Sequence, residues 1–61
     1  MKDSHMYKRL SDANGYKALV NMLKNQPTHI AEQVFENITD QADDHPKYEA
    51  IKEIWLKRFE Q

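Results

Sequence analysis

The side chains that could do chemistry in this chain of 61 residues are three histidines, two serines and ten carboxylates. A metal site needs three or four converging ligands, usually with local spacing such as His-x₃-His. His5, His29 and His45 lie far apart in the sequence, and none has such a neighbour. The chain has no cysteine, which excludes thiolate zinc sites and disulfides. The sequence therefore predicts no metal site and no cofactor.

The two serines are the only hydroxyl or thiol groups that we consider as nucleophiles. Ser4 and Ser11 both precede the clear helical pattern, in a flexible or capping region. A serine nucleophile needs a base within reach, an orienting partner for that base and preferably a cleft. A chain of this length has little room to enclose a pocket of a few hundred cubic ångströms, and one glycine cannot build a phosphate-binding loop. We predict that the protein is not an enzyme.

Carboxylates, in contrast, follow a regular spacing. Three of them recur at i, i+4 and i+8, two more follow, and no Lys or Arg stands between residues 28 and 45. We call this set the acidic ridge; it consists of Glu32, Glu36, Asp40, Asp43 and Asp44. Like charges four residues apart on a helix cost a few tenths of a kcal/mol per pair. The ridge is either a solvated face turned toward the basic first third of the chain, or a surface that docks on a basic patch of another protein or occupies a nucleic-acid-binding cleft.

Basic side chains gather elsewhere. Residues 1–27, the basic first part of the chain, contain five Lys or Arg residues: Lys2, Lys8, Arg9, Lys17 and Lys24. The helix–proline–helix stretch from Leu19 to Ile38 has some features of a helix-turn-helix, but its second helix exposes carboxylates where a recognition helix needs basic or amide groups. The last segment mixes Lys with Glu, which would weaken attraction to phosphates. The sequence argues against nucleic acid as a partner, and we keep a helix-turn-helix-like DNA-binding regulator as the alternative function.

The elements that must position these groups are three helices. Pro27 and Pro46 mark boundaries, because proline is tolerated at a helix start but not in a helix interior. Apolar residues recur at helical spacing in each segment, and helices are expected over Asn14–Asn25, Thr28–Gln41 and Pro46–Glu60. One glycine argues against hairpin-rich sheets. We predict an all-α, compact three-helix domain with a core of Leu19, Leu23, Val34, Ile38, Ile51 and Trp55.

The third expected helix is apolar over a wide arc. Ile54 and Leu56 flank its central stripe and widen the arc to ~200°, which is more than one neighbouring helix can cover. Packing against both other helices explains this width, and a partner surface is the other explanation. Dimerisation stays open, with Ile54 and Leu56 as the seam.

The ends of the chain add two further expectations. Residues 1–10 are predicted to be a flexible N-terminus, and 11–61 the three-helix domain. Ser4, His5 and Met6 match what a common tag and cloning junction leaves, so residues 1–6 are interpreted as including a cloning remnant, the alternative being a genuine flexible terminus. There is neither a signal peptide nor an apolar run of ~18 residues, so we expect a cytoplasmic protein with no membrane partner.

Together these patterns predict a small non-enzymatic protein–protein interaction module, such as an adaptor, an inhibitor or a regulatory subunit. Its partner would be another protein, bound through the acidic ridge or through the apolar edge formed by Ile54 and Leu56.

Overall fold

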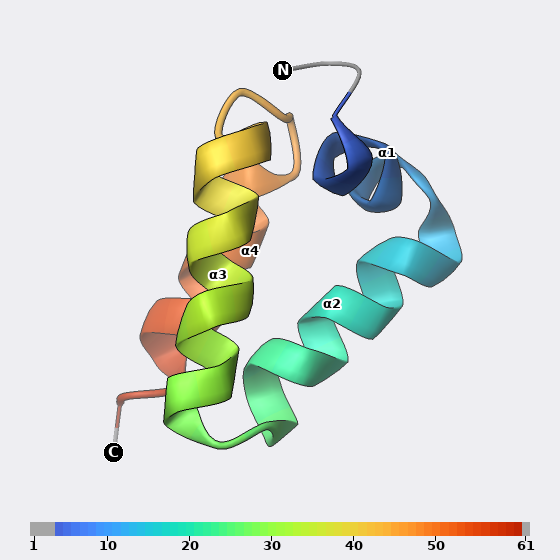
Figure 1. Cartoon of the computed structure of the whole chain (residues 1–61). Helices are drawn as coiled ribbons and strands as arrows, with labels where there is room; N and C mark the ends of the chain where they lie inside the picture. Colours follow the sequence, from blue (N-terminus) through green and yellow to red (C-terminus); the bar gives the residue numbers. More distant parts are fainter. Residues whose placement is uncertain (1–3, 61) are drawn as a thin grey trace.

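The chain folds into four α-helices. The computed structural model describes residues 4–60 and contains α1 (His5–Ser11), α2 (Ala13–Asn25), α3 (Thr28–Ala42) and α4 (Tyr48–Lys57), with no strand in that range (Figure 1). The predicted all-α class is confirmed. The predicted number of three helices is wrong, because the segment before Asp12 forms a helix of its own.

Helix α1 corrects the expectation of a flexible N-terminus over residues 1–10. Met6 and Leu10 of this helix are buried, and Leu10 is fully enclosed. Four residues separate them, so both side chains fall on one face of the helix, toward the core. The structure thus includes residues 4–10 in the fold; residues 1–3 lie outside the described part, and the cloning-remnant interpretation of residues 1–6 stays a prediction.

Side-chain caps mark the starts of α1 and α2. The Ser4 hydroxyl oxygen accepts a hydrogen bond from the backbone N–H of Tyr7 at 3.1 Å, and the hydroxyl donates to the carbonyl of Gln41 at 2.9 Å. Asp12 follows α1 and caps α2, because its carboxylate accepts from the N–H of Gly15 at 2.9 Å. Caps of this kind satisfy orphan N–H groups and stabilise a helix by about 1 kcal/mol. The first also joins α1 to the end of α3.

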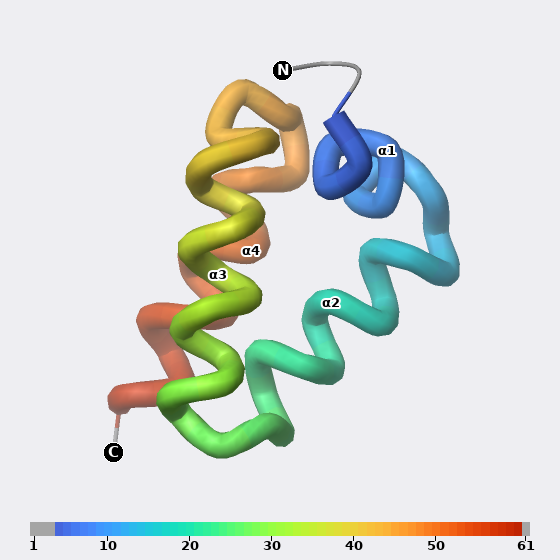
Figure 2. The backbone as a smooth tube through the Cα atoms, in the orientation of Figure 1, coloured from blue at the N-terminus to red at the C-terminus, as the bar shows by residue number. Residues whose placement is uncertain are grey.

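The helices pack around one another so that α1 contacts α2 and α3, while α2 and α3 each contact α4 as well as one another. The backbone trace shows α1 lying across one end of the molecule, close to the turn between α3 and α4, while the last residues approach the turn between α2 and α3 (Figure 2). The radius of gyration is 10.7 Å, close to the ~10.5 Å expected for a compact chain of this length.

All four helices contribute to the core. The buried apolar residues are Met6, Leu10, Leu19, Leu23, Ala31, Ile38, Ala42 and Ile51. Four of the six predicted core residues are among them; the other two, Val34 and Trp55, pack against this cluster without being fully buried. The predicted core contains no residue of α1, because the sequence predicts a flexible terminus over residues 1–10.

Helix boundaries follow the predictions closely for two helices and poorly for the third. Helices α2 and α3 begin and end within one residue of the expected bounds. Helix α4 is shorter than the expected Pro46–Glu60, because residues 43–47 form a turn in which the N–H of His45 donates to Ala42 and the N–H of Tyr48 donates to His45. Pro46 therefore lies in the turn and does not open the helix.

Aromatic side chains hold α4 against α3. The Phe35 ring stacks on Tyr48 and on Trp55, with centroids 6.1 Å and 5.4 Å away, and Phe59 meets the Trp55 ring edge-on at 5.0 Å. The Tyr48 hydroxyl lies 2.9 Å from the Thr39 hydroxyl. Such aromatic pairs stabilise by about 0.5–1.5 kcal/mol beyond the area they bury.

Arg58, at the C-terminal end of α4, connects this helix to the α2–α3 turn. Its guanidinium donates to the carbonyl of Leu23 at 2.6 Å and to the carbonyl of Gln26. The terminal carbonyls of α2 are thereby satisfied by a positive group, which also suits the negative end of the helix dipole.

Gly15 has a packing role that the sequence did not reveal. It lies inside α2 with ordinary helical backbone rather than in a turn. A Cβ atom built there would lie 2.5 Å from the carbonyl oxygen of Arg9. Because that neighbour is backbone and cannot rotate away, only glycine lets α1 approach α2 so closely.

We predict that Gly15→Ala destabilises the protein by about 1–3 kcal/mol, since separating α1 from α2 costs more than the ~1 kcal/mol that alanine gains in helix propensity. Urea unfolding followed by circular dichroism measures this. Asn14→Ala at the neighbouring exposed position serves as the control and should be neutral or slightly stabilising. A Gly15→Ala variant as stable as the Asn14→Ala variant would contradict the proposed close approach.

Candidate functional site

The acidic ridge lies along the exposed side of α3. Glu32, Glu36 and Asp40 are all exposed, whereas Ala31 and Ile38 on the opposite side of the same helix are fully buried. A spacing of four residues places successive carboxylates about 6 Å apart along the helix. Asp43 and Asp44 are also exposed and continue the ridge into the α3–α4 turn. The structure therefore places Glu32, Glu36 and Asp40 on one exposed side of α3, and leaves Asp43 and Asp44 exposed in the turn that follows.

The predicted apolar edge is not a single surface. Ile54 is half-buried and lies against α2, whereas Leu56 is 55% exposed. Two residues on a helix are separated by ~200°, so the two side chains leave α4 in nearly opposite directions. The other exposed apolar side chain in this part of the chain is Phe59, which follows the end of α4 and is 52% exposed.

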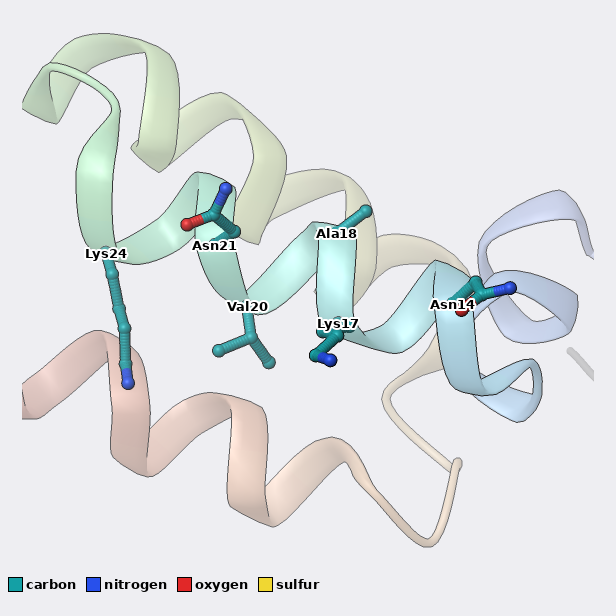
Figure 3. Close-up of a pocket in the computed structure, with 6 residues that line it drawn as sticks. All are labelled: Asn14, Lys17, Ala18, Val20, Asn21 and Lys24. Atoms are coloured by element: carbon teal, nitrogen blue, oxygen red, sulfur yellow. The ribbon is translucent and has the colours of Figure 1, made fainter.

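A groove that sequence reasoning missed runs between α2 and α4. Of three open hollows of about 440–450 Å³, the second and third are lined from both sides of this groove, and the first adjoins them on α2 alone. Figure 3 shows the first of them, with Val20 and Lys24 extending from α2 toward α4. We call this feature the basic groove, because its lining includes Lys17, Lys24, Lys47, Lys57 and Arg58.

The basic groove separates cations from carboxylates that are their neighbours in sequence. None of the residues lining the three hollows is acidic. Glu49 and Glu53, which the sequence interleaves with the lysines of α4, are not among them. Lys57 follows Ile54 by three residues and Glu53 by four, so Glu53 lies beyond Lys57, on the side of it away from Ile54, and is outside the lining.

The exposed side of α3 does not suit DNA recognition. The exposed residues of this helix include acids, amides, His29 and Ile30, and the helix has no Lys or Arg. A helix that enters the major groove usually offers basic or amide side chains to bases and phosphates. In this fold the cations line the groove between α2 and α4 instead.

One serine and one histidine come together, which their separation in the sequence had hidden. The Ser11 hydroxyl oxygen lies 2.9 Å from Nε2 of His45. His45 is 7% exposed and sits in the α3–α4 turn, with the Tyr7 ring edge-on at 4.3 Å. His45 is buried although it lies in a turn, because α1 covers it.

The hydrogen bonds around His45 oppose catalysis at this pair. The backbone N–H of Lys47 donates to Nδ1 at 2.9 Å, so Nδ1 is the acceptor of the neutral ring and Nε2 carries the proton. Nε2–H then donates to Ser11, whose hydroxyl donates to the Tyr7 carbonyl at 3.2 Å. A general base toward serine needs the opposite tautomer, held by an acceptor at Nδ1. The arrangement instead joins α1 to the α3–α4 turn.

Burial lowers the pKa of His45 from its usual value of 6.5, and the charge of Lys47 lowers it further, while Asp44 acts in the opposite direction. Protonation would also replace the acceptor at Nδ1 with a second donor facing the Lys47 N–H. The folded state therefore favours neutral His45, and the unfolded state binds the proton more readily. Stability linked to this group is complete above the unfolded pKa and falls as the pH decreases below it.

We predict that the free energy of unfolding falls between about pH 7 and pH 5.5, above the range where most carboxylates titrate. His45→Gln should lower stability at pH 7.5 by about 1–2 kcal/mol through its altered hydrogen bonds, and should flatten the dependence on pH. Urea titrations across this range measure both effects. The exposed His29→Gln control should keep the acid-side loss. An equal slope in wild type and His45→Gln would contradict the role assigned to His45.

Within residues 4–60 no group of three or more His, Asp or Glu side chains is placed to hold a metal ion. In the same range no helix has both the length and the apolar character that crossing a bilayer requires. Comparisons with protein-family models, curated proteins and solved structures gave no match to this chain. Its function must therefore be argued from its surfaces alone.

Proposed function

We propose that this chain is a small non-enzymatic protein-interaction module, such as an adaptor, an inhibitor or a regulatory subunit, and that the acidic ridge docks on a basic patch of a partner protein. The observation that carries the proposal is the uninterrupted line of exposed carboxylates on α3, a helix with no Lys or Arg.

The energetics of the ridge favour a bound state. Three carboxylates at successive i, i+4 positions repel one another by a few tenths of a kcal/mol per pair in the free helix. Cations from a partner would remove this repulsion and would speed association by electrostatic steering. Asp43 also adds negative charge at the negative end of the α3 dipole, and a positively charged partner would weaken that unfavourable interaction.

The absence of an enzymatic role is supported by the His45 tautomer. The one serine–histidine pair among the described hydrogen bonds has its proton on the nitrogen that faces the serine. The hydrogen bonds of this pair connect α1 to the α3–α4 turn, which is a structural role. The three hollows on the surface are open rather than enclosed.

The outer side of α4 is a second docking surface within the same proposal. Leu56, near the end of α4, and Phe59, in the turn that follows, are each more than half exposed and lie three residues apart in the sequence. This pair replaces Ile54 and Leu56 as the apolar edge. We retain it as the seam for dimerisation, whose readout is sedimentation at two protein concentrations.

A DNA-binding regulator is the runner-up proposal. The gathering of Lys17, Lys24 and Lys57 along one groove favours it, and the acidic exposed side of α3 opposes it. Binding to duplex DNA at low salt would promote this alternative, and no binding under those conditions would remove it.

We predict that Glu36→Lys/Asp40→Lys reduces partner capture at least tenfold without loss of helicity, because it reverses two adjacent charges of the ridge. The measurement is affinity capture from the native host, with mass spectrometry comparing what the variant and wild-type chains retain. Glu49→Lys/Glu53→Lys is the matched control, since it makes the same charge change on exposed positions of α4. Capture that is unchanged by the ridge variant would remove the ridge as the docking surface.

A further inference from the structure

We infer that the basic groove between α2 and α4 is a binding surface separate from the acidic ridge, and that its occupant is an acidic amphipathic helix of a partner protein. The inference stands on the groove's own lining, so it can hold or fail independently of the ridge.

The groove is continuous. Lys24 lines both the first and the second hollow, Ile54 lines both the second and the third, and Lys17 and Val20 line both the first and the third. Hollows that share their walls form one surface rather than three isolated dimples. On α2 the lining extends from Ala13 to Lys24, which is a length of about 17 Å along the helix axis. A helical segment of about 12 residues has the same length.

The charges of the groove select an acidic occupant. Lys47 already lies over the Tyr16 ring at 4.8 Å, and Arg58 binds carbonyls at the end of α2. Lys17, Lys24 and Lys57 are exposed, and they are left to meet charges on a ligand. No carboxylate is among the residues that line the three hollows, so the lining itself is cationic. Charges placed at a rim in this way govern specificity and the rate of association more than affinity.

The floor of the groove supplies the apolar contact that affinity requires. Val20 and Ile54 line the same hollow from α2 and α4 and are only half-buried. An apolar floor flanked by charged rims matches a helix whose apolar residues recur at i, i+3 or i+4 and i+7, with acids on its flanks. Such a helix would cover Val20 and Ile54 and pair with the lysines at once.

Two other occupants fit less well. A phosphate backbone would meet the lysines but gains nothing from the apolar floor, because it has no apolar group to bury there. A second copy could offer the acidic ridge of α3, but Gln33 and Asn37 lie beside its carboxylates, and α3 has one large exposed apolar side chain, Ile30 in its first turn. The groove therefore fits a foreign helix that is both acidic and amphipathic.

The test is selection of 16-residue peptides from a displayed random library on the full chain, followed by affinity measurements on the enriched sequences made as synthetic peptides. The expected result is enrichment of acidic peptides with helical apolar spacing. Their affinity should fall at least tenfold in Lys17→Glu/Lys57→Glu. It should stay within twofold in Lys8→Glu/Lys52→Glu, which makes the same charge change on exposed residues outside the groove lining.

Amide shift mapping with the same peptides should place the contact on α2 and α4, and circular dichroism checks that each variant is folded. Failure to enrich any acidic amphipathic peptide would overturn the inference, as would peptides that bind the groove variant as tightly as wild type. If the wild-type chain bound a 20-bp duplex DNA more tightly than the peptides and the groove variant lost that binding, the groove would be assigned to nucleic acid. If the wild-type chain self-associated and the groove variant did not, the groove would be assigned to a second copy. Binding should be unchanged in Glu36→Lys/Asp40→Lys, which separates this inference from the proposed role of the ridge.

Discussion

The packing of α1 across the end of the other helices is the interaction on which the rest of the structure depends. Chains of this length bury only ~60% of their unfolded surface, so each large buried apolar side chain contributes a large share of the stability of the fold. Helix α1 adds Met6 and Leu10 to the core and covers His45. The approach is possible because Gly15 presents no Cβ to the backbone of α1. Removing α1 would expose both the core and a buried polar ring.

Around the core that all four helices share, the surface divides by charge. The exposed side of α3 carries the acidic ridge, while cations from α2 and α4 meet along the groove between them. The net charge of −1 conceals this separation. Two surfaces of opposite charge on one small domain are the basis of the proposal that it binds partners through different faces.

Sequence reasoning located the two helices whose apolar periodicity is long. It missed α1 because seven residues contain too few turns to show a period, and because Ser4, His5 and Met6 match a cloning junction. Gly15 could not be understood locally, since its neighbour across the contact is the Arg9 carbonyl, and glycine in a helix interior is normally unfavourable. The separation of Ile54 from Leu56, in contrast, follows from helical geometry and could have been deduced.

The two candidate surfaces likewise differ in how far the sequence could predict them. The acidic ridge is local to one helix, so its spacing predicted it. The basic groove is assembled from two helices more than twenty residues apart, and only packing decides that Lys17 and Lys57 face one hollowed surface while Glu53 does not. The pairing of Ser11 with His45 depends likewise on the position of α1, which periodicity did not find.

Native-state hydrogen exchange tests the central claim that α1 is part of the cooperative fold. The account predicts that the amide of Leu10 exchanges only through global unfolding, with the same free energy of opening as the amides of Leu23 and Ile38. Exchange of the Leu10 amide near its unprotected rate, while Leu23 and Ile38 stay protected, would contradict it.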